Sequence, residues 1–419
     1  MMKNIKRKIA SLLLTAVCLV TGFAVLSFAE DKKSETFAGS SVSVADYGAV
    51  ADDGNDDTDA FIAAAKSGKN IYIPFGEFLV SKTVTVKNVK LAGCGSGRGG
   101  SAIIGTSGDV KAPILILEGT ARLESVQIRY TPESLLLNEG EGDRVAVQTG
   151  SEGNPMTIGS AIKNIIFYDI GTAIYSPKGT NTGAGGALFE TLEINRYTYR
   201  GVDMQTENRL GNTYSNIYIA SVDRTNSAHA ATSGFALEGS ETGTVANQIN
   251  VEHTDLKIPM LIQNVKNFSI SSIHIEGVLT TQADMGYVHI ENSSGFIGGI
   301  TAYFTRVQYE RGSLISFGNA ETPQSVRIGT AHICGINGPD QTAWGTWMDT
   351  IATPAGWTRG RATGAGKSFR VLGRQSGAAG EYNIVVDQYS YYTYENDRAE
   401  YDTFKTDSNL KVTLTKGAE

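Results

Sequence analysis

The stretch SSIHIEGV, residues 271–278, places His274 and Glu276 two residues apart inside an apolar strand pattern. Successive side chains of a β-strand point to opposite faces. If Ile273 and Ile275 face a core, His274 and Glu276 therefore both face away from it. An imidazole beside a carboxylate is suited to acid/base chemistry. The alternative is an ordinary pair of polar residues on the solvated side of a strand, and the neighbours of the pair decide between the two interpretations.

Apolar pairs of the same kind recur along the chain at intervals of 24 to 32 residues, separated by Gly, Asn, Ser and Thr. Such a repeat is typical of a parallel β-solenoid, in which each coil stacks on the preceding one. A β-sandwich or antiparallel barrel is the alternative. The predicted inward pairs are Ile165/Phe167, Leu192/Ile194, Ile217/Ile219, Ile249/Val251, Ile273/Ile275, Ile300/Ala302 and Ala331/Ile333, and a second series comprises Ile174, Met204, Leu237, Ile262 and Ile290.

Stacked coils align equivalent outward residues in columns, which places Glu252 and Glu276 one coil apart with His274 beside them. Two carboxylates about 5 Å apart at the backbone repel each other. A pair of this kind can serve as a proton donor and an ionised nucleophile or base, as glycosidic bond cleavage requires. We therefore predict that Glu252, Glu276 and His274 are catalytic; a polar ladder without chemistry is the alternative. The predicted substrate-binding residues are Glu193, Tyr218, Asn250, His253, Asp255, Tyr303 and Arg306.

The first 29 residues have a basic start, an apolar stretch and small residues at Ser27 and Ala29, a pattern that predicts a secretory signal peptide. An uncleaved membrane anchor is the alternative. Either interpretation places the remaining chain outside the cytoplasm, and cleavage predicts no further membrane association. Removing the four basic residues of this segment changes the formal net charge from −7 to −11, which argues against nucleic acid as a partner.

The segment VADYGAVADDGNDDTDAFIAAAKSGKNIYIPFGEFLVS, followed by VKLAGCGSG, contains an Asp-Tyr-Gly-Ala strand, an acidic loop, a helical stretch and a Tyr-Ile-Pro strand. It resembles the N-terminal module of the pectate-lyase-like superfamily of right-handed parallel β-helices. The resemblance implies an all-β, right-handed parallel β-helix with an N-terminal capping helix. It also implies secretion, frequent homotrimer assembly and action on polysaccharide. The reaction stays open, because the superfamily includes hydrolases, lyases, epimerases and tailspikes.

The predicted organisation is a signal peptide (1–29), a linker (30–42), a parallel β-helix with its N-terminal cap (43–338) and a β-rich C-terminal cap (339–419). In the helical stretch, Thr58 or Asp57 is expected to cap the helix and Gly68 to end it. The apolar stripe is expected at Phe61, Ile62 and Ala65. The acidic loop, Asp52, Asp53, Asp56 and Asp57, is interpreted as helix capping rather than a metal site.

The leading functional prediction is a secreted glycoside hydrolase that cleaves a polysaccharide with Glu252 and Glu276 and needs no cofactor. Neither Gly-His-Gly nor Arg-Ile-Lys occurs, which argues against a polygalacturonase. The second hypothesis is a lyase acting on a uronic-acid polymer, with His274 or Tyr303 as the base and Arg306 or Arg311 neutralising the substrate carboxylate. In a lyase, Glu252 and Glu276 would instead hold Ca²⁺. The third is a non-catalytic glycan-binding β-helix.

Overall fold

The computed structural model describes residues 41–131, 140–220, 231–252, 255–276, 279–280, 286–304, 313–335, 371–373, 379–393, 405–406 and 410–416. The predicted signal peptide and most of the linker lie outside these ranges. Within the described residues, no helix is both long and apolar enough to cross a membrane.

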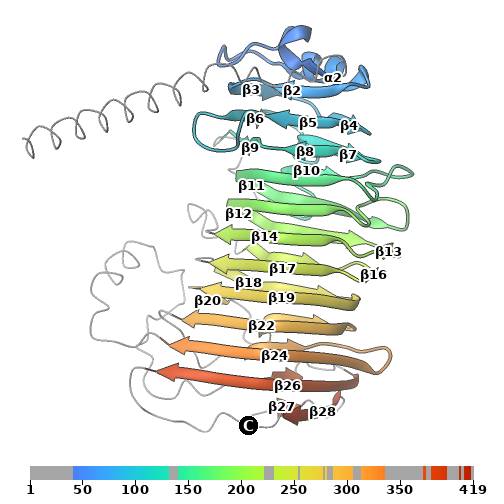
Figure 1. Ribbon diagram of the computed structural model, residues 1–419, viewed down its shortest axis with the longest axis vertical. Coiled ribbons are helices and arrows are strands. Elements are labelled where there is room, and N and C mark those ends of the chain that lie inside the picture. Colours follow the sequence, from blue (N-terminus) through green and yellow to red (C-terminus); the bar gives the residue numbers. More distant parts are fainter. Residues whose placement is uncertain are drawn as a thin grey trace, which may run out of the picture. The chain divides into compact units, whose positions relative to one another are not determined.

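The N-terminal end of the fold carries its helices, as the sequence predicts (Figure 1). Strand β1 (Ser41–Ser43) leads into the 3₁₀ helix η1 (Val44–Tyr47), and α2 spans Thr58–Lys66. Phe61 and Ala64 of α2 are buried, whereas Ile62 and Ala65 are only partly buried against the core. The deepest part of the apolar stripe therefore includes Ala64 rather than Ala65. The helix is followed by Gly68 at φ 68°, a left-handed conformation that favours glycine.

The acidic loop before α2 joins the helix to strand β3 (Gly76–Val80). Asp56 Oδ1 accepts a hydrogen bond from the Thr58 backbone N at 3.0 Å, so Asp56 supplies the predicted cap. Asp57 occupies the N-cap position, as predicted, but its side chain makes no capping hydrogen bond. Its carboxylate instead accepts from the backbone N atoms of Val50 at 2.9 Å and Leu79 at 3.3 Å. Desolvation by burial, opposed by these bonds, raises the pKa of Asp57.

From β2 onward the chain forms a parallel β-helix, and Figure 1 shows its strands stacked in sequence order from blue to red. Three ladders of parallel strands run along the stack, here named A, B and C in the order in which each coil visits them. In the first coils the ladders use separate strands: β2 (Asn70–Ile73), β5 (Lys90–Gly93) and β8 (Arg122–Glu124) in A; β3, β6 (Ser101–Gly105) and β9 (Gln127–Tyr130) in B; β4 (Val84–Lys87), β7 (Leu115–Glu118) and β10 (Val145–Thr149) in C.

In later coils, longer strands span the corners between ladders. β11 (Ala161–Gly179) and β12 (Leu188–Thr206) run through all three ladders. Ladders A and B then continue in β14 (Thr213–Ala220), β17 (Val245–Glu252), β19 (Lys266–Glu276), β22 (Ser294–Phe304), β24 (Gln324–Gly335), β26 (Gly380–Thr393) and β28 (Leu410–Lys416). Ladder C continues in β15 (Ala231–Leu237), β18 (Asp255–Gln263), β20 (Leu279–Thr280), β21 (Gly286–Glu291), β23 (Ser313–Phe317), β25 (Val371–Gly373) and β27 (Lys405–Thr406), while β13 (Arg209–Leu210) and β16 (Glu241–Thr242) are short bridging strands.

The register of ladder B is the predicted one. The pairs that begin with Ile165 and Phe167 continue through Ile273 and Ile275 to Ala331 and Ile333 without a slip. In ladder C the first predicted step is wrong by two residues, because Ile174 pairs with Val202 and Met204 pairs with Ser176. From Met204 to Ile290 the predicted series is correct. The parallel β-helix is therefore confirmed.

In the four coils from β8 to β14, the corner between ladders A and B contains a residue in the left-handed conformation. These residues are Ser125, Asn164, Thr191 and Asn216, with φ between 53° and 56°. Asparagine adopts this conformation more readily than other residues with a Cβ, and a β-branched residue there is strained. The corner fixes the faces toward which ladder B presents its side chains.

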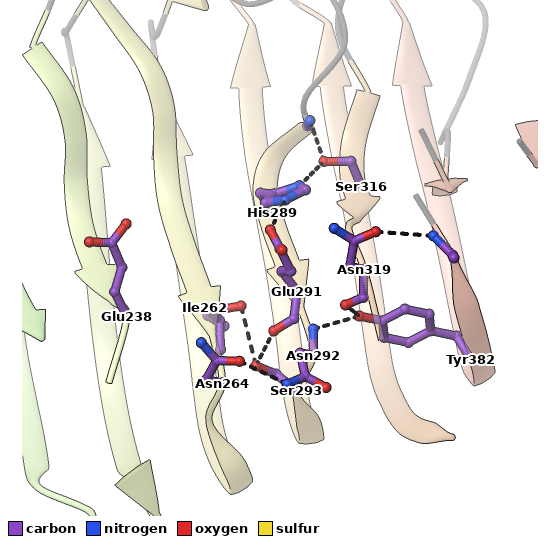
Figure 2. A network of polar contacts seen from close by, with 12 residues as sticks. Glu238, Ile262, Asn264, His289, Glu291, Asn292, Ser293, Ser316, Asn319 and Tyr382 are labelled. Carbon is purple, nitrogen blue, oxygen red and sulfur yellow. Dashed lines mark hydrogen bonds and ion pairs between the residues drawn. The ribbon is translucent and has the colours of Figure 1, made fainter. Parts of the chain in front are cut away.

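A second corner, after ladder C, is held by polar side chains (Figure 2). Asn292 Nδ2 donates to Asn264 Oδ1 at 2.8 Å. The Tyr382 hydroxyl accepts from the Asn292 backbone N at 2.8 Å and donates to the Asn319 carbonyl at 3.1 Å. Tyr382 belongs to β26, so parallel stacking continues beyond position 338. The predicted domain boundary at that position stays a prediction, and the three tryptophans lie outside the described residues.

Candidate active site

The candidate site lies on the outward face of ladder B, across β14, β17 and β19. Glu252 ends β17 and pairs in register with Glu276, which ends β19. His274 pairs with Asn250, and Asn250 pairs with Tyr218 of β14. Because Ile273 and Ile275 are buried on the inward face, His274 and Glu276 point outward, as the alternation predicts.

The three predicted catalytic side chains converge on one point. His274 Nε2 lies 3.3 Å from Glu276 Oε2 and 3.6 Å from Glu252 Oε1. The three nearest side-chain donor atoms all lie within 4.8 Å of one another. The side chains are partly exposed, from 16% for Glu252 to 26% for the other two. This arrangement is accessible to a ligand and brings two carboxylates to a shared imidazole.

Tyr218 contacts one of the two carboxylates, and its predicted contact with substrate stays a prediction. Its hydroxyl donates a hydrogen bond to Glu252 Oε2 at 3.0 Å. Burial, together with the nearby carboxylate of Glu252, raises the pKa of Tyr218 to about 12, so the phenol keeps its proton at neutral pH. The phenol therefore orients the carboxylate of Glu252.

The other predicted substrate-binding residues divide into two groups. Glu193 and Asn250 stand in the same column as Tyr218 and His274, and Glu193 Oε1 accepts from Asn195 Nδ2 at 2.7 Å. In the second group, Tyr303 of β22 pairs in register with Glu276, so its backbone lies one coil further along the same column, but its side chain is not described. Of Asp255 only the backbone is described, in β18, and His253 and Arg306 lie outside the described residues.

Sequence reasoning missed a second His-Ile-Glu tripeptide, at residues 289–291 in β21 of ladder C. His289 Nδ1 lies 2.8 Å from Ser316 Oγ, and His289 Nε2 lies 3.5 Å from Glu291 Oε2 (Figure 2). The Ser316 hydroxyl also accepts from the Gly286 backbone N at 2.6 Å. His289 is 1% exposed. The repeat of the His-Ile-Glu tripeptide was the sequence signal that could have indicated His289 and Glu291. The imidazole of His289, however, is closed to solvent.

Ladder C also carries a buried ion cluster that no sequence pattern indicated. Arg200 Nη1 contacts Asp203 Oδ1 at 2.8 Å and also pairs with Glu238, while Gln205 Nε2 donates to both Asp203 oxygens at 3.2 Å. Burial raises the pKa of Asp203 to about 6, although Arg200 opposes the shift. Asp203 is fully buried, so this carboxyl stabilises the arrangement of Arg200 and is not reachable by a polymer.

A profile of the family described as "Rhamnogalacturonase A/epimerase, pectate lyase-like" matches residues 41–115. These residues contain η1, the acidic loop, α2 and the first coil strands, on which the parallel ladders are built. Residues 41–115 are therefore similar to this family, and the chain as a whole has the parallel β-helix fold. No curated protein matches the chain.

Solved structures of parallel β-helix proteins match nearly the whole chain at low identity. The DFA-IIIase of Arthrobacter chlorophenolicus A6, without its lid and in complex with GF2, has a TM-score of 0.51 and 12% identity, covering 90% of this chain and 94% of that one. The N-terminal fragment of bacteriophage Phi29 gene product 12 has a TM-score of 0.51 and 14% identity, covering 94% of this chain and 69% of that one. Tailspike protein 2 of Escherichia coli O157:H7 bacteriophage CAB120 has a TM-score of 0.50 and 14% identity, covering 90% of this chain and 46% of that one. These similarities concern the fold.

Proposed function

We propose that this pectate-lyase-like protein is a secreted glycoside hydrolase that cleaves a polysaccharide with Glu252 and Glu276. The observation that carries the proposal is the convergence of two carboxylates from successive coils on His274, with donor atoms within 4.8 Å of one another. A carboxyl pair about 5 Å apart suits a retaining mechanism, whereas an inverting enzyme needs a wider separation for its water. The description of the matching family supports a polysaccharide substrate.

The hydrogen bond from Tyr218 supports an assignment of the two roles. Glu252, whose Oε2 is oriented by the phenol, is the nucleophile. Glu276 is the acid: it donates its proton to the glycosidic oxygen as the bond to the sugar carbon breaks, and Glu252 forms an ester with that carbon. Glu276 then takes a proton from a water molecule, whose oxygen displaces Glu252 and restores both side chains. His274 contacts both carboxyl groups and positions them.

Purified protein incubated with a panel of plant, algal and microbial polysaccharides tests the reaction class. Hydrolysis produces new reducing ends without ultraviolet absorbance, whereas a lyase would produce both, because β-elimination leaves an unsaturated uronate. Glu252→Gln and Glu276→Gln should each reduce the rate by about 10²- to 10⁴-fold.

A homotrimer, which the resemblance implies, stays a prediction.

Glu291→Gln is the matched control, because Glu291 also lies beside a histidine and is 17% exposed, close to the 16% of Glu252. It should retain activity. Loss of activity in Glu291→Gln together with normal activity in Glu252→Gln would move the active site to ladder C. Normal activity in both Glu252→Gln and Glu276→Gln would overturn the proposed carboxylate pair.

A further inference from the structure

The distances around His274 match those between ligands of one tetrahedral metal ion. With metal–ligand bonds of about 2.1 Å, two ligands of a tetrahedral zinc ion stand roughly 3.4 Å apart. His274 Nε2 lies 3.3 Å from Glu276 Oε2 and 3.6 Å from Glu252 Oε1. An ion could therefore contact the imidazole and both carboxylates after only small side-chain rotations.

The donor set selects the class of ion. One imidazole and two carboxylates suit Zn²⁺, Co²⁺ and similar divalent transition metals. Ca²⁺ takes six to eight oxygen ligands, and Mg²⁺ requires octahedral oxygen coordination, so neither suits a site with an imidazole at this spacing. The set also resembles catalytic rather than structural zinc sites in ligand number, since three protein ligands leave the fourth position to water or a sugar hydroxyl.

Tyr218 supplies the outer hydrogen bond that metal-binding carboxylates commonly have. It donates to Glu252 Oε2, while the other oxygen, Oε1, faces His274. One oxygen is thus held by the protein and the other is directed toward the ion position. Such outer partners orient a ligand before the metal arrives.

The second His-Ile-Glu tripeptide shows what this site has in addition. His289 and Glu291 have a similar contact distance, 3.5 Å, but His289 is only 1% exposed. In the described part of the chain, a group of three potential ligands is formed by Glu252, His274 and Glu276 and by no other residues.

We propose that Glu252, His274 and Glu276 form a binding site for one divalent transition-metal ion of the Zn²⁺ class. Binding does not depend on the proposed hydrolase function. A consequence of binding does rest on that function: an ion coordinated by both carboxylates occupies the lone pairs that hydrolysis needs, so zinc should inhibit the enzyme. The proposal departs from the sequence-based prediction of no metal.

Cobalt titration of the untagged, chelator-treated protein tests the binding. Co²⁺ should bind at one equivalent per chain, give the intense visible absorption of tetrahedral cobalt and be displaced by Zn²⁺ but not by Ca²⁺. His274→Ala and Glu276→Gln should abolish the spectrum, and Tyr218→Phe should weaken affinity by about 10- to 100-fold. Glu291→Gln should bind as the unaltered protein does.

Two outcomes would overturn the metal site: no tetrahedral cobalt spectrum at any concentration, or an unchanged spectrum in His274→Ala that circular dichroism shows to be folded. The outcome for the hydrolase is separate. If zinc binds through His274 but leaves polysaccharide cleavage unaffected, the metal site stands and the proposed catalytic pair is wrong. If cleavage depends on Glu252 and Glu276 but no metal binds, the proposed catalytic pair stands and the metal site is wrong.

Discussion

At the scale of single residues, the two carboxylates of the site are made unequal by one phenol. Glu252 and Glu276 are chemically identical and adjacent in register, yet only Glu252 accepts a hydrogen bond from Tyr218 among the contacts described. A hydrogen bond to a charged group contributes about 1.5–3 kcal/mol. Tyr218 is therefore a positioning residue whose removal should affect the charged form of Glu252.

Tyr218→Phe keeps the ring and removes the hydroxyl. We expect kcat to fall by roughly 10- to 100-fold, the range that corresponds to losing such a bond. Because burial and Glu252 raise the pKa of Tyr218 to about 12, the phenol stays protonated across the pH range of ordinary assays. The ratio of the two kcat values should therefore be constant between pH 7 and pH 9. A ratio that changes within this range would contradict the assigned role.

The two His-Ile-Glu tripeptides mark the limit of prediction from single residues. Both present His and Glu outward on either side of a buried isoleucine, Ile275 or Ile290. Sequence reasoning found the first because Glu252 stands one coil away in a column that could be aligned. The local sequence His-Ile-Glu does not distinguish a partly exposed His274 from a buried His289, because burial depends on contacts with other parts of the chain.

At the scale of elements, the single-residue corner between ladders A and B decides where ladder B points. Asn164 and Asn216 suit its left-handed conformation, but Thr191, in the coil between them, is β-branched and has φ 54°. Left-handed backbone costs a residue with a Cβ about 1–2 kcal/mol, and asparagine tolerates it best. Thr191 is exposed, so its side chain contributes little packing to offset this cost.

Thr191→Asn should therefore stabilise the protein by about 1 kcal/mol, measured as a higher midpoint of thermal unfolding. The matched reverse change, Asn216→Thr, should lower the midpoint by a similar amount because it introduces the strain that Thr191→Asn removes. Equal midpoints for the two variants would mean that the corner conformation does not contribute to stability.

The ladders also explain which elements were predictable. Ladder B keeps two inward residues per coil at a regular alternation, and every one of its pairings was correct. In ladder C, the first step was wrong because Val202 and Met204 are both buried apolar residues of β12, and the partner of Met204 in β11 is the buried polar residue Ser176. Apolar periodicity does not reveal an inward position that carries a polar side chain.

At the scale of the whole molecule, a buried carboxyl links stability to pH. Glu241 is 1% exposed and accepts hydrogen bonds from Asn212 Nδ2 at 3.1 Å and Thr244 Oγ1 at 2.7 Å. Burial raises its pKa from 4.5 to about 7. Between these two values the folded protein holds a proton that the unfolded chain has released. The free energy of unfolding must therefore fall as the pH rises through this window, by about 3 kcal/mol in total.

Glu241→Gln cannot ionise and should remove this dependence. Relative to the unaltered protein, its thermal midpoint should be similar near pH 4.5 and higher at pH 8, with the difference growing between these values. Glu152→Gln changes an exposed carboxyl and should show no such growth. A constant difference across the pH range would indicate that Glu241 stays ionised in the folded protein.

The asymmetry of the coils that carry the candidate site has a consequence for engineering. In β14, β17 and β19, ladders A and B share one continuous strand. The chain spacing from ladder B to ladder C varies: β14 ends at Ala220 with β15 beginning at Ala231, but β17 ends at Glu252 with β18 beginning at Asp255. At the candidate site, insertions and exchanges are thus accommodated after ladder B. Swapping connections after β14 should change which polymers are accepted while leaving the carboxylates where they are.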